Sequence, residues 1–275
     1  MKIELAKSYG FCFGVKRAIK QAEKTKDAAT IGPLIHNNDE ITRLKNDFNV
    51  NTLNDISELG NEKKAIIRTH GITKQDLDNL KTSGREIIDA TCPFVKKPQE
   101  IVEKMSSEGY EIVIFGDSNH PEVKSVRSYA TTNNYVVLDE NELNEVKFKN
   151  KVALVSQTTK KVEKFMQIAN YLMLKVKEVR VFNTICDATF KNQEAIKSLA
   201  MKSDVMIIVG GKNSSNTKQL FLIAKEHCKD SYLIENENEL DYRWFNNKKL
   251  CGVSAGASTP DWIIEKVVKK IENFS

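Results

Sequence analysis

Short runs of branched apolar residues alternate along the chain with longer stretches in which apolar residues recur at helical spacing. The short runs are rich in Val, Ile and Leu and have the length of strands. Stretches such as residues 99–109 and 192–202 have the spacing of amphipathic helices. Nearly continuous apolar strands are typical of sheets covered by helices on both faces, so the pattern predicts an α/β protein with mostly parallel sheet. The expected strands lie within residues 28–35, 63–69, 85–91, 110–116, 134–139, 151–157, 203–211, 231–236 and 249–255.

The loops after these strands resemble one another in three parts of the chain. In one set, a strand end is followed by a glycine and polar side chains: GPLIHNNDE, GDSNHPEV and GGKNSSNT. In a second set, a strand end runs into an expected helix start: RTHGITKQDL, SQTTKKVEKF and SAGASTPDWI. A third set pairs DATCPFVKKPQE with CDATFKNQEA. Because ligands of open α/β sheets bind beyond the carboxyl ends of the strands, the repetition predicts three similar parts that contribute to one site.

Composition and charge argue against several classes of protein. Hydrophobic residues make up 40% of the chain and charged residues 29%, as in an ordinary globular protein. The net charge of +5 arises from 42 basic and 37 acidic residues that are interspersed, so we expect no nucleic-acid binding. No apolar run reaches the roughly 18 residues that cross a bilayer, and no signal-peptide core is present at the start. We therefore expect a cytoplasmic protein that does not bind membranes.

The five cysteines direct attention to metal chemistry, because an odd number in an expected cytoplasmic chain argues against a disulfide framework. Cys12, Cys92 and Cys186 occur about once per repeat, each at a junction that leads into an expected helix. If three similar parts pack around a pseudo-threefold axis, these cysteines meet at the centre, where three thiolates suit a soft metal or an iron–sulfur cluster. Spacing alone also allows buried structural cysteines, which is our interpretation of Cys228 and Cys251.

The chain resembles the LytB/IspH family of diphosphate reductases in nine segments that occur in family order between residues 10 and 261. They are GFCFGVKRA, GPLIHN, RTHG, DATCP, HPEV, SQTT, CDATFKNQEA, GGKNSSNT and SAGASTPD. The resemblance implies a pseudo-threefold trefoil of three similar α/β domains around one central 4Fe–4S cluster. It also implies that Cys12, Cys92 and Cys186 ligate three of the irons, which leaves the fourth iron open to the substrate.

The same resemblance implies a division of the chain and a reaction. We expect domains at residues 13–91, 92–185 and 186–275, with residues 1–12 packed on the third. The implied reaction removes the allylic hydroxyl of 4-hydroxy-3-methylbut-2-enyl diphosphate, with two electrons and two protons. Its products are isopentenyl and dimethylallyl diphosphate, in the last step of the non-mevalonate isoprenoid pathway. Since the sequence has no nucleotide-binding motif, we expect an external electron donor, a ferredoxin or flavodoxin.

The matching motifs assign roles to individual side chains. Glu122 in HPEV corresponds to the proton source, Thr158 in SQTT to a hydrogen-bonding partner of the substrate oxygen, and His120 to a participant in proton delivery. Without the resemblance, Glu122 would be an ordinary first-turn glutamate after a proline, and the serines would be helix caps. The family's substrate-binding set corresponds to His36, His70, His120, Thr158, Ser214, Ser215, Asn216 and Ser258.

Two other functions are compatible with parts of the pattern. A zinc-dependent phosphate-ester hydrolase could use the same cysteines or the three loop histidines, but its usual short ligand spacings are missing from the sequence. A non-catalytic iron–sulfur redox sensor could use the same cysteines. A sensor has no need for a proton relay beside the metal, so Glu122 and Thr158 favour the reductase over the sensor.

Overall fold

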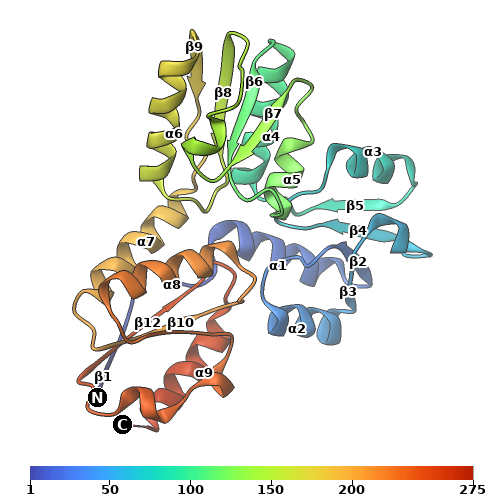
Figure 1. The fold of residues 1–275 in the computed structure, drawn as a ribbon. Coiled ribbons are helices and arrows are strands. Elements are labelled where there is room, and N and C mark those ends of the chain that lie inside the picture. Colours follow the sequence, from blue (N-terminus) through green and yellow to red (C-terminus); the bar gives the residue numbers. More distant parts are fainter. Residues whose placement is uncertain (275) are drawn as a thin grey trace. The chain divides into compact units, whose positions relative to one another are not determined.

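The computed structural model describes residues 1–274, so the last residue of the expected third domain lies outside the described part (Figure 1). The strands are β1 (Lys2–Leu5), β2 (Ala28–Ile31), β3 (Val50–Leu53), β4 (Lys64–Ile67), β5 (Glu86–Asp89), β6 (Glu111–Phe115), β7 (Asn134–Val137), β8 (Lys151–Ser156), β9 (Glu178–Val181), β10 (Val205–Val209), β11 (Ser231–Ile234) and β12 (Leu250–Ala255). The α-helices are α1 (Phe13–Thr25), α2 (Asn38–Phe48), α3 (Lys74–Thr82), α4 (Pro93–Ser107), α5 (Pro121–Arg127), α6 (Val162–Lys175), α7 (Asp187–Ala200), α8 (Ser215–His227) and α9 (Asp261–Glu272).

The strands form three four-stranded sheets with the same topology. Their orders are β3-β2-β4-β5, β7-β6-β8-β9 and β11-β10-β12-β1, and all neighbouring strands are parallel. We number the strands of each sheet by their place in the repeat: β2, β6 and β10 are first, β3, β7 and β11 second, β4, β8 and β12 third, and β5, β9 and β1 fourth. The first and third strands lie at the centre of each sheet. The amino-terminal strand β1 occupies the place that β5 and β9 occupy in the other sheets. The predicted α/β class with three similar parts is therefore confirmed.

The repeat extends to the segment after the second strand of each sheet. A short 3-10 helix follows there in all three cases, at Ile56–Leu59, Glu140–Leu143 and Glu237–Glu239. Each is capped by the side chain of Asp55, Asp139 or Asn236, which accepts a hydrogen bond from the backbone two residues later. The three parts thus share local capping as well as strand order.

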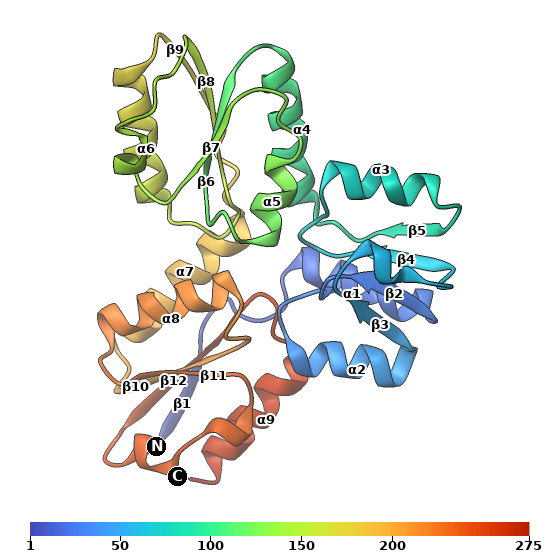
Figure 2. The same cartoon turned by 45° about the vertical axis from the view of Figure 1, so that its right-hand side comes forward.

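Helices cover both faces of the sheets, and side-chain alternation assigns each face to its helices. In β6, Ile112 and Ile114 pack in the cluster that includes residues of α4 and α5, whereas Val113 and Phe115 face α6. Figure 2 shows α6 on one side of this sheet and α4 and α5 on the other. In β10, the odd-numbered residues pack against α9 and the even-numbered ones against α7 and α8. This double coverage explains why the central strands have continuous apolar runs.

Three strands were missed by the apolar pattern, namely β1, β3 and β9. Their sequences are KIEL, VNTL and EVRV, and each lies at the edge of its sheet. An edge strand is partly exposed, so polar residues are tolerated and no continuous apolar run is needed.

The chain divides into two compact units. Unit 1 comprises residues 1–16, 35–43 and 187–275 and holds the sheet that contains β10. Unit 2 comprises residues 17–34 and 44–186 and holds the other two sheets. Among residues 1–274, no helix combines the length and the apolarity needed to cross a bilayer.

Candidate active site

The predicted substrate-binding residues follow the central strands of the three sheets. After the first strand of each sheet the chain crosses to the neighbour on one side, whereas the third and fourth strands are neighbours on the other side. In sheets of this topology a crevice lies between the carboxyl ends of the first and third strands. The first strand of each sheet precedes a loop with His36, His120 or Ser214, and the third precedes a loop with His70, Thr158 or Ser258. The sequence predicted that these loops are equivalent, and the strand order explains why they carry polar residues.

The three predicted metal-ligating cysteines follow the fourth strand of each sheet and occupy equivalent positions. The backbone N–H of Cys12 donates to the carbonyl of Ala257 at 3.2 Å, that of Cys92 to Thr69 at 3.0 Å and that of Cys186 to Thr158 at 3.0 Å. Each acceptor lies in the loop after the third strand of the same sheet. One repeated hydrogen bond therefore fixes each cysteine beside a loop that carries predicted substrate-binding residues.

Each of these cysteines directly precedes a helix. Cys92 is the N-cap residue of α4, while Cys12 and Cys186 come immediately before α1 and α7. All three are partly exposed, and no disulfide forms among the cysteines of the described residues. Because a helix N-terminus carries partial positive charge, it stabilises a thiolate placed there. Each of the three cysteines offers a soft sulfur donor of the kind that ligates iron–sulfur clusters and other soft metal centres.

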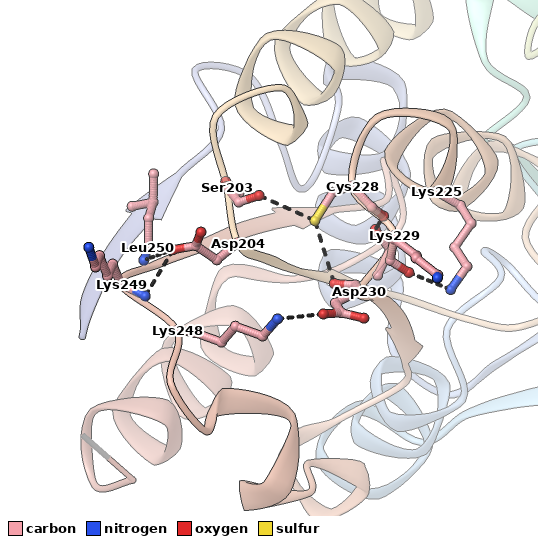
Figure 3. A network of polar contacts seen from close by, with 10 residues as sticks. Ser203, Asp204, Lys225, Cys228, Lys229, Asp230, Lys248, Lys249 and Leu250 are labelled. Carbon is pink, nitrogen blue, oxygen red and sulfur yellow. Dashed lines mark hydrogen bonds and ion pairs between the residues drawn. The ribbon is translucent and has the colours of Figure 1, made fainter.

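The other two cysteines, Cys228 and Cys251, are buried within unit 1. Cys228 donates its thiol to the carbonyl of Ser203 at 3.4 Å, beside an ion pair between Lys248 and Asp230 (Figure 3). Cys251 lies inside β12, where burial raises the pKa of its thiol to about 12. These environments are consistent with the structural role that the sequence suggested for both residues.

Glu122 and Thr158 are joined by two hydrogen bonds within unit 2. The carboxylate of Glu122 accepts from the backbone N–H of Thr158 and from its hydroxyl, both at 2.7 Å. Glu122 lies in the first turn of α5 and is only 2% exposed. Thr158 is also buried, and its carbonyl accepts from the N–H of Cys186. Thr158 therefore contacts both the predicted acid Glu122 and the predicted metal ligand Cys186.

Burial raises the pKa of Glu122 from its ordinary value of 4.5 to about 7. The hydrogen bonds from Thr158 and the charge of Lys160 act in the opposite direction, but desolvation of the carboxylate outweighs them. A carboxyl group with a pKa near neutrality can both hold and release a proton at physiological pH. Burial, which the sequence could not reveal, is what distinguishes Glu122 from an ordinary surface glutamate in a first helical turn.

Two histidines extend this arrangement within unit 2. His120 is the N-cap of α5, and its Nδ1 accepts from the backbone N–H of Glu122 at 3.2 Å. In the neutral ring the proton therefore lies on Nε2. The rings of His120 and His70 meet edge to face, with centroids 5.4 Å apart. His70 follows Thr69, whose carbonyl accepts from the N–H of Cys92. Within unit 2, these contacting residues therefore form a continuous series from Cys92 to Cys186.

The remaining predicted substrate-binding residues lie in unit 1. Ser214 caps α8, and its side chain accepts from the N–H of Thr217. Ser258 donates its hydroxyl to the backbone carbonyl of His36 at 3.2 Å. A Cβ on Gly211 would lie 2.3 Å from the same carbonyl, so glycine is needed for this close approach. Ser215 occupies the first position of α8.

Asn216 has the strongest indication of a ligand in unit 1. Its side chain is 5% exposed, and neither its amide nitrogen nor its amide oxygen has a hydrogen-bond partner within the described residues. Such a group costs about 1–3 kcal/mol when left unsatisfied, so buried amides are normally paired. The adjacent Thr217 also has a buried hydroxyl oxygen without a partner among the described residues. The N-terminal turn of α8 is therefore suited to binding a polar or anionic ligand.

Two functional candidates were missed by the sequence analysis. Arg17 donates to the carbonyls of Asp89 and Thr91, both at 3.1 Å, and so supports the loop that leads to Cys92. Lys160 is close enough to Glu122 to act on its carboxylate, and burial lowers the pKa of its own ammonium group. The position of Lys160, two residues after Thr158 in the same loop, was the available signal for this residue.

Comparisons of this chain with known proteins agree on one protein family. The model of the LytB protein family matches residues 3–272. A protein of Campylobacter lari named 4-hydroxy-3-methylbut-2-enyl diphosphate reductase is 74% identical over 100% of this chain and 99% of its own length. A protein of the same name from Campylobacter fetus is 72% identical, with the same coverage.

Solved structures of proteins with this activity share the fold. One, described as the terminal enzyme of the non-mevalonate pathway, is 44% identical, with a TM-score of 0.73 over 98% of this chain and 99% of its own. Another, a diphosphate reductase from Plasmodium falciparum, is 27% identical, with a TM-score of 0.91 over 97% of this chain and 86% of its own.

Proposed function

Because this chain belongs to the LytB protein family, we propose that it reduces 4-hydroxy-3-methylbut-2-enyl diphosphate. The C–O bond of the allylic hydroxyl breaks, two electrons and two protons are taken up, and water leaves. A proton added at either end of the resulting allylic unit gives isopentenyl or dimethylallyl diphosphate. The reaction takes place in the cytoplasm as the last step of the non-mevalonate pathway.

The cofactor in this proposal is one 4Fe–4S cluster held by Cys12, Cys92 and Cys186. The partly exposed sulfur donors at three helix starts fit such a group. When bound, the cluster supplies electrons and an open, Lewis-acidic iron. The expected trefoil division into residues 13–91, 92–185 and 186–275, with residues 1–12 on the third domain, belongs to the same proposal.

The observation that carries the proposal is the buried pair formed by Glu122 and Thr158. A hydroxide ion is a poor leaving group, so the departing oxygen must receive a proton. Glu122 holds that proton, and the hydroxyl of Thr158 can accept it and pass its own to the substrate oxygen. His120 contacts the backbone of Glu122 and assists the delivery.

The diphosphate is bound by groups that donate hydrogen bonds to anionic oxygens. The binding residues are His36, His70, His120, Thr158, Ser214, Ser215, Asn216 and Ser258. The unpartnered amide of Asn216 and the N-terminal turn of α8 support the phosphate-binding part of this assignment. Electrons come from an external carrier, a ferredoxin or flavodoxin.

The first test is a metal and sulfide analysis of protein purified without oxygen. We expect about four irons and four acid-labile sulfides per chain, with a broad visible absorption band. The same preparation should convert the hydroxylated diphosphate when reduced viologen is supplied. Zinc without sulfide, reproduced after anaerobic reconstitution, would overturn this function and favour the hydrolase.

The raised pKa of Glu122 predicts a specific pH dependence. The folded state keeps this carboxyl protonated to about pH 7, whereas the unfolded chain releases the proton near 4.5. Stability should therefore fall as pH rises between these values, by up to about 3 kcal/mol. Urea unfolding at about pH 5 and about pH 8 measures the change, and Glu122→Gln should remove this contribution. An unchanged pH dependence in the variant would show that Glu122 is not the group responsible.

Replacing the unpartnered amide predicts a loss of substrate affinity. Asn216→Ala should raise the KM for the diphosphate roughly 10- to 100-fold, as expected for a lost hydrogen bond to a charged group. Iron content should stay the same. The matched control is Asn192→Ala, because the buried Asn192 already accepts a hydrogen bond from Ser8. Equal effects of the two substitutions on KM would contradict a binding role for Asn216.

A further inference from the structure

The amino-terminal strand β1 has one side of its backbone without a neighbouring strand. It lies at the edge of the sheet in unit 1 and pairs only with β12 (Figure 1). The backbone N–H groups of Lys2 and Ala6 donate to carbonyls in or next to β12, at 2.8 and 2.9 Å. Alternate residues of a parallel strand bond to the same neighbour, so the N–H and C=O groups of Ile3 and Leu5 point away from the sheet. Within residues 1–274, the backbone of Ile3 and Leu5 makes no hydrogen bond on that side.

The sequence of β1 is complementary to a second copy of itself. When two such strands pair antiparallel with Ile3 opposite Ile3, these two residues exchange both of their outward hydrogen bonds. The same register places Lys2 of each copy opposite Glu4 of the other, so each of these cross-strand pairs joins opposite charges. Leu5 then lies opposite Met1 of the second copy. The pairing is reciprocal, as a twofold-symmetric interface requires.

The surface around this edge is open to a partner. The side chain of Lys2 is 75% exposed, and Leu5 is 38% exposed. A groove of about 540 Å³ lies between β1 and α9, with charged side chains of α9 and the apolar side chains of Leu5, Tyr9, Ile264 and Val268 in its lining. Met1 and Ile3 pack on the same face of the sheet as α9. The Met1 side chain of a second copy would therefore cover Leu5 beside this groove, which removes apolar surface from water.

The fourth strand of another sheet differs from β1 in how its charges are used. In unit 2, β9 also has opposite charges two residues apart, at Glu178 and Arg180. Both are engaged within their own unit, because Glu178 accepts from a tyrosine hydroxyl and Arg180 forms an ion pair with a glutamate at 2.8 Å. In β1, Glu4 contacts Lys202, but the ammonium of Lys2 lies 3.9 Å from Glu4 and is largely exposed. Lys2 is therefore available to a partner strand.

We propose that β1 pairs antiparallel with β1 of a second copy of this chain, which joins two four-stranded sheets into one continuous sheet. Backbone hydrogen bonds hold the two copies together, as in other cases where a strand is added to an exposed sheet edge. The opposite charges of Lys2 and Glu4 fix the register. The interface uses none of the groups assigned to the proposed reaction, so either can fail without the other.

The first test measures the mass of the native, cluster-loaded protein by sedimentation equilibrium over a range of concentrations. We expect single chains in equilibrium with pairs of chains. Ile3→Pro removes the outward N–H and keeps the N–H groups that face β12, so the Kd of self-association should rise about tenfold or more. Ile3→Ala also loses the side chain but keeps the N–H, and should self-associate more tightly than Ile3→Pro. The matched control is Val179→Pro, which removes the outward N–H of β9 and should leave self-association unchanged.

The second test exchanges charges and does not depend on whether the proline variant folds. Lys2→Glu or Glu4→Lys alone places like charges opposite each other in a pair of identical copies, so each should weaken self-association about tenfold. An equal mixture of the two variants should restore pairing, because opposite charges then meet at both positions. Urea unfolding of each variant shows that the chains are folded.

Three results would overturn this interface. The first is a single-chain mass of the original protein at all concentrations. The second is self-association that folded Ile3→Pro retains in full or that Val179→Pro loses to the same extent. The third is a mixture of Lys2→Glu and Glu4→Lys that pairs no better than either variant alone.

Discussion

Serine in place of Cys12, Cys92 or Cys186 is expected to remove most of the iron and sulfide from the protein. A hydroxyl is a far weaker ligand for iron than a thiolate, and each of these residues supplies one of three protein ligands in the proposal. Turnover should fall by at least about 100-fold in each variant. Iron and sulfide analysis, together with the visible absorption spectrum after anaerobic reconstitution, measures the result.

The matched controls are the two buried cysteines. Cys228→Ser and Cys251→Ser should keep the full iron content, because neither thiol belongs to the proposed cluster site. Cys251→Ser places a hydroxyl in the core beside apolar residues, so it should lower the free energy of unfolding by about 1–3 kcal/mol. Retention of a complete cluster after any one of the three ligand exchanges would contradict the assignment of that cysteine.

Glu122→Gln is expected to reduce turnover about 10²- to 10⁴-fold while the cluster and the binding of the diphosphate are retained. Glutamine has nearly the same shape, and its amide oxygen can still accept from the N–H of Thr158. It cannot supply the proton that the departing hydroxyl needs. Steady-state turnover with reduced viologen, measured beside the iron content and the affinity for the product, separates this chemical defect from misfolding.

Two further variants test whether the defect is specific. Glu111 is also buried in unit 2, where its carboxylate accepts from Asn133 and from the backbone of Lys149, so Glu111→Gln should affect stability and leave turnover per folded molecule intact. Thr158→Ser keeps a hydroxyl and should retain more activity than Thr158→Val. Near-normal turnover in Glu122→Gln would remove this residue from the mechanism.

The repeated pattern of strands and loops was visible in the sequence because it depends on short-range features. The central strands are buried on both faces, so their apolar runs stand out, and glycine and polar residues mark the turns after them. Half-exposed edge strands such as β1 have no such signal. The pairing of β1 with β12 joins residues near the two ends of the chain, and only the tertiary structure shows such a contact.

The residue types of the candidate site were also set by the sequence, through ordered motifs that resemble one family. Their chemical states were not. Glu122 in a first helical turn gains a pKa near 7 only because residues distant in sequence bury it, and Asn216 is recognisable as an unpartnered amide only in the folded unit. Arg17 and Lys160 likewise gain their importance from neighbours brought close by folding. The sequence by itself therefore determined the family and the repeat and predicted the reactive groups, because these are carried by local patterns. Burial, pairing and charge environment were decided by the tertiary structure, because they depend on contacts between distant segments.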